Sequence, residues 1–236
     1  MPNWGRRAPL TELMDDPAVD YDTLGACLAD LAKVNTLTLG RRPTLAFLER
    51  LARDGLWPAD RPLEILDVGS GHGDMLRAIA HWARRRGLAV SLTGLDRSPW
   101  AARAAAALPT PGAPIRWLTE DLFDHQGQAD LVISALFAHH LDDDQLARFL
   151  AWMDQRARLA WFVNDLRRSA VSYYGFAALA RLMGWHPFVR HDGPVSIRRA
   201  FRKDDWRRLL AAAGVGGARI QPRFPFRLCV AKVISP

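Results

Sequence analysis

Apolar residues recur along the chain at two different spacings. From Tyr21 to Leu51 leucines return mostly at helical intervals, interrupted by a glycine and a proline, which predicts two or more N-terminal helices. Asp22–Thr23 and Arg42–Pro43 are the expected helix starts, because Asp and Thr cap free amides and proline is tolerated in a first turn. We expect these helices to pack on, or close over, the rest of the chain.

Beyond Pro62, short β-rich runs alternate with amphipathic stretches, which indicates a parallel sheet with crossover helices. Seven strands are predicted, at Leu63–Val68, Val90–Asp96, Ile115–Thr119, Leu131–Ser134, Leu159–Asn164 and near Ala218–Pro222 and Leu228–Val233. Helices are predicted at Met75–Arg86, Trp100–Ala107, Asp143–Gln155, Ser169–Gly184 and Lys203–Ala213, with a turn at Pro109–Pro114. The closely spaced last pair of strands suits a doubly wound sheet completed by an antiparallel edge strand.

Composition changes this picture little. The chain has 236 residues, 49% of them hydrophobic and 24% charged, which fits a single globular domain. The net charge of +7 can attract nucleic acid, but the arginines stand in short groups typical of solvated helix faces. Cys27 and Cys229 fit no zinc or disulfide pattern. The first ten residues lack the apolar run of a signal peptide and no segment is long enough to span a bilayer, so a cytoplasmic location is expected.

The segment from Glu64 to Asp74, EILDVGSGHGD, is an apolar strand that runs into a glycine loop and then a helix. Gly69 and Gly71 permit a tight turn, and the amides at the helix start can meet a negative group. The dinucleotide pattern G-x-G-x-x-G requires a third glycine where Asp74 stands, and a carboxylate there would repel a pyrophosphate. The loop therefore predicts a cofactor other than a dinucleotide.

The arrangement E-x-L-D-x-G-S-G-x-G resembles the first motif of class I S-adenosylmethionine (SAM) dependent methyltransferases. In that family the residue at the position of Asp67 lies near the methionine part of the cofactor, and the glycine loop follows the cofactor's backbone. Asp96 ends the next strand, about 20 residues beyond the loop, where a carboxylate can accept two hydrogen bonds from a ribose diol. A cap for the helix that begins near Ser98 is the alternative role for Asp96.

Further positions match the later motifs of the same family. Asp121 and Leu122 stand where the family contacts the adenine, with a solvated acidic turn as the alternative, and Asp130 precedes the fourth strand as the family's Asp does. The resemblance covers Glu64 to Leu141 and implies SAM as cofactor, with S-adenosylhomocysteine (SAH) as its product. The predicted cofactor contacts are Asp67, Gly69, Ser70, Gly71, Gly73, Asp96, Arg97, Asp121, Leu122 and Ser134.

Two adjacent histidines follow the fourth predicted strand, at the carboxyl edge where open α/β sheets bind ligands. The segment Phe137-Ala138-His139-His140-Leu141 resembles the L-H-H-L segment of ubiquinone/menaquinone-type and related small-molecule methyltransferases, which borders the methyl-transfer site. His139 and His140 are the candidate catalytic bases, because an imidazole titrates near neutral pH. Capping a helix or bonding a backbone carbonyl is the alternative, and adjacent histidines are expected to face different ways.

The predicted substrate contacts lie beyond the fifth strand. Asn164 and Arg168 stand at the same sheet edge, and a guanidinium can grip an anionic group with two parallel hydrogen bonds; an ion pair between Arg168 and Asp165 is the alternative. The aromatic-rich stretch that follows predicts a lid over an apolar or aromatic substrate, with Tyr173 and either Arg198 or Arg199 facing it. For each aromatic taken singly, packing in the core is the better interpretation. Its last part, Asp192–Phe201, is predicted as a turn and a short strand.

Taken together, these patterns predict an α/β protein with a doubly wound, Rossmann-like, seven-stranded and mostly parallel sheet, covered by helices on both faces. The single domain is expected to consist of an N-terminal helical cap (1–60), a cofactor-binding core (61–166), a substrate-lid insertion (167–201) and a C-terminal helix with edge strands (202–236). We expect a monomer or a homodimer without a membrane span.

The predicted reaction is methyl transfer from SAM to a small-molecule substrate, with O-methylation of an aromatic or polyketide-like hydroxyl favoured over C-methylation. No metal is expected. The positive charge supports an RNA methyltransferase as an alternative, but Ser134–Phe137 lacks the N/D-P-P-Y/F segment of enzymes that methylate nucleic-acid amines, so a nucleic-acid partner is disfavoured. A non-catalytic SAM-binding protein is a further alternative. Asp74 and the lack of a Tyr/Lys pair argue against a nicotinamide-dependent oxidoreductase.

Overall fold

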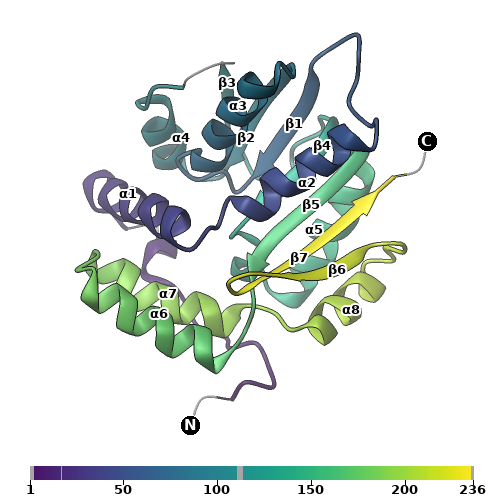
Figure 1. Ribbon diagram of the computed structural model, residues 1–236. Helices are drawn as coiled ribbons and strands as arrows, with labels where there is room; N and C mark the ends of the chain where they lie inside the picture. The colour runs from purple at the N-terminus through teal and green to yellow at the C-terminus, as the bar shows by residue number, and fades with distance from the viewer. Residues whose placement is uncertain (1–2, 17, 111–113, 235–236) are drawn as a thin grey trace.

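The protein is described here from a computed structural model, which covers residues 3–16, 18–110 and 114–234. Its centre is a seven-stranded sheet in the order β3-β2-β1-β4-β5-β7-β6 (Figure 1). Part of the turn expected at 109–114 lies outside the described residues. The strands are β1 (Leu63–Val68), β2 (Val90–Asp96), β3 (Ile115–Thr119), β4 (Ala129–Ala135), β5 (Ala157–Leu166), β6 (Arg219–Arg223) and β7 (Arg227–Val233).

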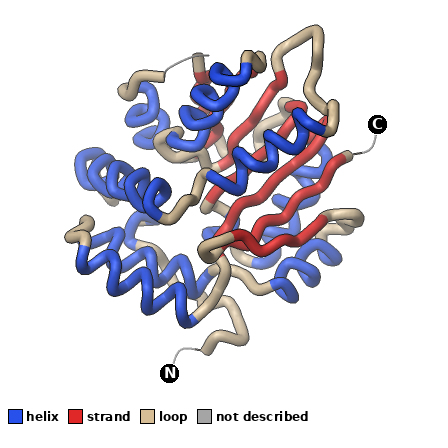
Figure 2. The backbone as a smooth tube through the Cα atoms, viewed as in Figure 1, coloured by secondary structure: helices blue, strands red, loops and turns tan. Residues whose placement is uncertain are grey.

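Helices separate the first five strands, except that β4 follows β3 with no helix between them (Figure 2). The first helix begins two residues earlier than expected, because the Asp20 side chain, rather than Asp22, caps it by accepting from the Thr23 amide. The helices are α1 (Tyr21–Leu37), α2 (Arg42–Arg53), α3 (Asp74–Arg86), α4 (Pro99–Ala106), α5 (Asp143–Arg156), α6 (Ala170–Leu182), α7 (Pro187–Arg199) and α8 (Lys203–Ala212), with short 3-10 turns η1 (Leu13–Asp15) and η2 (Ala138–His140).

The sheet is buried on both faces, which explains why its strands are nearly continuous apolar runs. Successive side chains of a strand point to opposite faces, so Leu63 and Ile65 pack with α2 and α3, whereas Leu66 and Val68 pack with α5 and α8. β5 follows the same alternation. Two apolar layers therefore sandwich the sheet and fix β1 and β4 side by side at its centre.

The strand order reverses between β1 and β4, so their connections leave the sheet in opposite directions. In such sheets a crevice opens at the carboxyl ends of the two central strands, and ligands bind there. The glycine loop after β1, Asp96 at the end of β2 and the η2 turn after β4 all lie at this edge. The topology thus brings together residues that are distant in sequence.

Two predicted features are wrong in detail. The antiparallel strand is not at the edge: β7 lies between β5 and β6 and runs antiparallel to both, so β6 forms the edge. The turn and strand predicted for Asp192–Phe201 belong mostly to α7, which contains Pro194. Tertiary packing overrides the turn signal there, because Gly193 lies directly against the Phe176 ring and allows α6 and α7 to approach closely.

The predicted lid is therefore a helical hairpin of α6 and α7, set apart from the sheet and beside α1 (Figure 1). A small apolar cluster joins the three helices through Val34, Ala180, Trp185 and Val189. Among the helices of the described ranges, none combines the length and the apolar character needed to cross a membrane.

Candidate active site

The glycine loop after β1 adopts a backbone that needs its glycines. Gly69, Gly71 and Gly73 have φ angles of 70°, 51° and 76°, in the left-handed region that side chains disfavour. Two of them also have no room for a Cβ atom, which would lie 2.4 Å from the Phe137 ring at Gly69 and 2.0 Å from the Trp117 ring at Gly73. The loop is thus pressed against β3 on one side and against the histidine turn on the other.

Asp67 is a buried carboxylate near the end of β1. It is 2% exposed, and its Oδ1 atom has no hydrogen-bond partner. Burial, together with repulsion from Asp74 and Asp96, raises the pKa of Asp67 well above its ordinary value. An unpaired buried carboxylate is costly, and a positively charged ligand group would satisfy it. The residue therefore fits the predicted place of a cofactor that carries an ammonium group.

The side chain of Asp96, at the end of β2, accepts hydrogen bonds from the glycine loop and from the segment before α4. Its Oδ2 atom accepts from the Gly71 amide at 2.9 Å and its Oδ1 atom accepts from the Ser98 amide at 2.9 Å. Burial raises the pKa of Asp96, and these two hydrogen bonds oppose the rise. Helix α4 is capped by Ser98 itself, so the capping role considered for Asp96 is only indirect. A carboxylate with two oxygens has further lone pairs for a diol.

The other predicted cofactor residues divide into backbone and side-chain positions. Ser70 is buried in the loop, and the side chain of Ser134 is committed to the Val68 carbonyl, to which it donates at 3.0 Å. Asp121 forms a local turn with the Phe123 amide, and the Leu122 side chain lies in the core, so only its backbone faces a ligand. Arg97 is exposed next to Asp96.

The connection between α1 and α2 closes over the glycine loop. Arg41 Nε lies 3.1 Å from a carboxylate oxygen of Asp74, and Asn35 donates to the same oxygen at 3.3 Å. Asn164, at the end of β5, donates to the Gly40 carbonyl at 2.8 Å. These contacts join the N-terminal helices to the edge of the sheet.

His139 is held by a carboxylate from the neighbouring strand. Its Nδ1 atom lies 2.8 Å from Oδ1 of Asp165, and its backbone amide donates to Oδ2 at 3.1 Å. Both side chains are almost fully buried. Burial favours a raised pKa for Asp165, but the His139 ring and the Leu166 amide outweigh it and lower that pKa. The carboxylate is thus charged and fixes the orientation of the ring.

His140 has a carboxylate partner of its own. Its Nδ1 atom lies 3.0 Å from Oδ1 of Asp15, a residue of η1. Burial lowers the pKa of His140, but Asp15 and Glu12 outweigh burial and raise it. The residue keeps 27% of its side chain exposed, against 3% for His139. The charge of His140 also opposes the burial that raises the pKa of Asp96.

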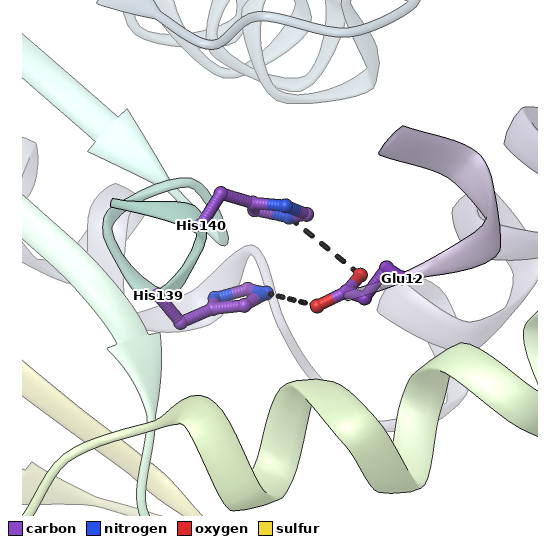
Figure 3. A group of neighbouring side chains, drawn as sticks. All are labelled: Glu12, His139 and His140. Carbon is purple, nitrogen blue, oxygen red and sulfur yellow. Dashed lines mark ion pairs between the residues drawn. The ribbon is translucent and has the colours of Figure 1, made fainter. Parts of the chain in front are cut away.

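The two histidines face the same carboxylate, which corrects the expectation that they point different ways (Figure 3). The 3-10 turn after β4 places the two rings at a centroid distance of 4.4 Å, with their planes tilted by 34°. Their Nε2 atoms lie 3.7 Å and 3.8 Å from the two oxygens of Glu12. Leu136, with a φ of 58°, sets up this turn in a conformation that is uncommon for a leucine.

Arginines fasten the N-terminal segment to the histidine turn. Arg199 donates to the carbonyls of His139 and His140 at 3.0 Å and 2.7 Å, and Arg7 donates to that of Leu141 at 2.7 Å. Asp192 of α7 accepts from the Leu13 and Met14 amides. The segment that carries Glu12 is therefore fixed from both sides.

The four predicted substrate residues do not converge. Asn164 is fully buried and bonded to Gly40 and Thr44, and Tyr173 packs edge-on against Trp4. Arg168 is also buried; its ion pair is with Asp205 at 2.8 Å, not with Asp165, and it donates to three backbone carbonyls. Arg198 lies on α7 with a buried, unpartnered Nε atom, whereas its neighbour Arg199 reaches the histidine turn.

Sequence reasoning missed the residues that complete the site. Glu12 and Asp15 belong to no motif, and no pattern sets them apart from Asp16 and Asp20, the other acidic residues among the first 20. The sequence predicted Asp165 only as a possible partner for Arg168.

A separate cleft of about 770 Å³ lies along α3 and is lined by residues that include Arg41, Asp74, Arg77 and Trp82. Its lining does not include His139, His140 or Asp96.

The chain was compared with protein families, with curated proteins and with solved structures. Residues 65–158 match the family model described as a methyltransferase domain, a range that runs from β1 into the start of β5. No curated protein sequence matches the chain significantly.

Several solved structures share the fold at low sequence identity. The plantazolicin methyltransferase BpumL in complex with SAH is 14% identical, with a TM-score of 0.63, and the match covers 91% of this chain and 96% of that one. The magnesium protoporphyrin IX methyltransferase ChlM from Synechocystis PCC 6803 with bound SAH is 18% identical, with a TM-score of 0.53 and 84% of each chain covered. A putative O-methyltransferase from Nostoc punctiforme PCC 73102 is 14% identical, with a TM-score of 0.54, over 88% of this chain and 60% of that one.

Proposed function

We propose that this protein, whose residues 65–158 match a methyltransferase domain, is a class I SAM-dependent methyltransferase that transfers a methyl group to a hydroxyl oxygen of a small aromatic or polyketide-like acceptor. The proposal joins the cofactor residues at the ends of β1 and β2 with the histidine turn after β4. Both groups lie at the carboxyl edge of the sheet, where this fold binds its ligands.

The residues present fit the cofactor. Asp67 offers an unpaired buried carboxylate for an ammonium group, the glycine loop offers close approach to its backbone, and Asp96 offers carboxylate oxygens to a diol. SAM supplies a methyl group on a positively charged sulfur, which leaves as the neutral thioether of SAH. Because that leaving group is already good, the protein's main tasks are alignment and the exclusion of water.

The buried contact between His139 and Asp165 is the main support for an oxygen atom as the methyl acceptor. A hydroxyl is a weak nucleophile until it loses its proton, and a neighbouring imidazole favours that loss. The carboxylates of Asp165 and Asp15 stabilise positive charge on the two rings, so the turn is suited to removing the proton. We assign acceptor activation to His139 and His140.

We infer the size and polarity of the acceptor from the side chains of the predicted lid. The hairpin of α6 and α7 carries several aromatic side chains beside the N-terminal segment, as in the contact of Tyr173 with Trp4. Two of the similar structures are named for methylating magnesium protoporphyrin IX and plantazolicin. Those names support an organic acceptor larger than a simple phenol, without identifying it.

The test is to incubate the purified protein with SAM and a panel of phenolic and polyketide-like compounds and to follow SAH formation and methylated products by mass spectrometry. We expect turnover with at least one acceptor, and a loss of roughly 10²-fold or more in His139→Gln or His140→Gln. His81→Gln, an exposed change on α3, is the matched control. SAH binding without turnover of any acceptor would support a SAM-binding protein without catalysis, and turnover of RNA alone would contradict the proposal.

A further inference from the structure

Three side chains from two distant parts of the chain converge on one point. Glu12 precedes η1, whereas His139 and His140 form η2 after β4. One potential ligand atom from each lies within 4.8 Å of the others. Figure 3 shows both imidazole rings directed at the two oxygens of the Glu12 carboxylate.

The distances from the ring nitrogens to the carboxylate are too long for hydrogen bonds. Nε2 of His139 lies 3.7 Å from one Glu12 oxygen and Nε2 of His140 lies 3.8 Å from the other. Tetrahedral ligands around a zinc ion stand about 3.4 Å apart, given metal–ligand bonds of about 2.1 Å. The two ring-to-carboxylate distances exceed this spacing by only a few tenths of an ångström, and all three ligand atoms lie within 4.8 Å of one another.

Each ring has its other nitrogen held by a carboxylate. Asp165 lies 2.8 Å from Nδ1 of His139, and Asp15 lies 3.0 Å from Nδ1 of His140. Histidine ligands of metals are typically oriented by such a carboxylate, which places the proton on Nδ1 and leaves the Nε2 lone pair free. The surroundings thus prepare both rings in the form that binds a cation.

Among the described residues, none donates a hydrogen bond to the Glu12 carboxylate. Its side chain is 95% buried, and Oε1 has no hydrogen-bond partner. The nearest guanidinium, that of Arg199, is 4.0 Å away and donates instead to backbone carbonyls and to Asp15. A buried carboxylate without a partner is unfavourable, and a cation between it and the rings would remove that cost.

We propose that Glu12, His139 and His140 bind a divalent first-row transition-metal ion of the Zn²⁺ type. Two imidazole nitrogens and one carboxylate form the ligand set of many catalytic zinc sites, in which a fourth position stays open. The sequence alone predicts no metal, because Glu12 is remote from the histidines and belongs to no motif. The fold supplies the third ligand.

A bound ion would also restrict which class of acceptor molecule reacts. This consequence rests on the proposed function. With the ion bound, His139 and His140 would serve as its ligands and not as bases, and an acceptor hydroxyl at the open position would lose its proton to solvent because the metal lowers its pKa. The resulting oxygen anion then attacks the methyl carbon as the bond from that carbon to sulfur breaks. Acceptors with a second oxygen beside the hydroxyl, which can hold the ion from two sides, are the favoured class.

The test measures metal binding without any methyl acceptor. The full-length protein is treated with a chelator, dialysed and titrated with Zn²⁺ by calorimetry, and Co²⁺ is added in parallel to read nitrogen and oxygen ligands from its visible spectrum. We expect one equivalent to bind with micromolar or tighter affinity. Glu12→Gln and His140→Gln should each weaken binding at least 100-fold, and Asp15→Asn, a change outside the ligand set, should weaken it 10- to 100-fold.

Controls separate loss of the site from loss of the fold. His81→Gln should bind Zn²⁺ as the wild type does, and every variant should retain the wild-type affinity for SAH, which reports an intact domain. No binding of Zn²⁺ or Co²⁺ to the wild type, or unchanged binding in Glu12→Gln, would overturn the metal site. Metal binding that persists while SAH fails to bind would leave this site standing and overturn the proposed function instead.

Discussion

Nδ1 of His139, in the η2 turn after β4, lies 2.8 Å from Oδ1 of Asp165 on β5. The second oxygen of the same carboxylate accepts from the His139 amide at 3.1 Å, so Asp165 holds both the ring and the backbone of the turn. Parallel pairing of β4 with β5 brings the two residues to one edge of the sheet. The orientation of the histidine turn is thus set by the sheet itself.

Replacing Asp165 by Asn should lower methyl transfer while leaving the cofactor site intact. The amide removes the negative charge that stabilises positive charge on His139, and we expect a fall in kcat of roughly 10²-fold. The KM for SAM should stay within a few-fold of the wild-type value, because Asp165 is not among the cofactor residues. Steady-state kinetics across pH measure both quantities.

The control for this variant is Asp60→Asn, an exposed change next to Arg61. It should alter neither kcat nor the KM for SAM. Equal losses in kcat and in the affinity for SAM in Asp165→Asn would contradict the assignment, since they would indicate a general disturbance of the fold.

Gly73→Ala should destabilise the protein by about 2 kcal/mol or more. The added Cβ would require a φ of 76° and would lie 2.0 Å from the Trp117 ring, so the loop or the ring must move. Chemical denaturation measures the free energy of unfolding. Gly216→Ala is the matched control, because its Cβ meets nothing within 4 Å, and it should change that free energy by less than about 1 kcal/mol. Equal effects of the two changes would contradict this account of the loop.

Asp130 should contribute stability that disappears in acid. Burial raises the pKa of this carboxyl, but bonds from Arg61, the Glu64 amide and Arg158 outweigh it and lower the pKa to about 2. A lowered folded-state pKa stabilises the fold above the unfolded-state value near 3.8, and the contribution is lost as pH falls toward about 2. Asp130→Asn should therefore lower the free energy of unfolding by about 2 kcal/mol at pH 7 and by clearly less at pH 3. A difference that does not depend on pH would contradict the ion-pair explanation.

Much of the sheet can be predicted from the sequence because its central strands, β1, β4 and β5, are buried on both faces. β1, β2 and β3 match their predicted bounds, since apolar runs of β-rich residues there end at glycine or charged residues. α7 could not be predicted in the same way. Asp192-Gly193-Pro194 carries strong local turn signals, and the helix exists because its Trp185-flanked start and Val189 pack into a cluster with α1 and α6.

Site residues can be predicted from the sequence only where they lie at or after the ends of predicted strands. Asp67, Asp96 and the histidine pair stand directly after or at the end of predicted strands, and the topology brings them to one edge. Glu12 was not predictable, because its position depends on how Arg7, Arg199 and Asp192 fasten an irregular segment. Whether the predicted substrate residues contact an acceptor stays a prediction, although Arg168 and Asn164 are bonded within the protein.

Titration of the purified protein with SAH by calorimetry, with NADH as the comparison ligand, tests the central claim most directly. We predict micromolar binding of SAH, none of NADH, and a loss of roughly 1–3 kcal/mol of binding free energy in Asp96→Ala, whose carboxylate is the proposed ribose contact. Asp54→Asn, an exposed change at the end of α2, is the control and should bind SAH normally. Absence of SAH binding by the folded wild-type protein, or a preference for NADH, would contradict the account.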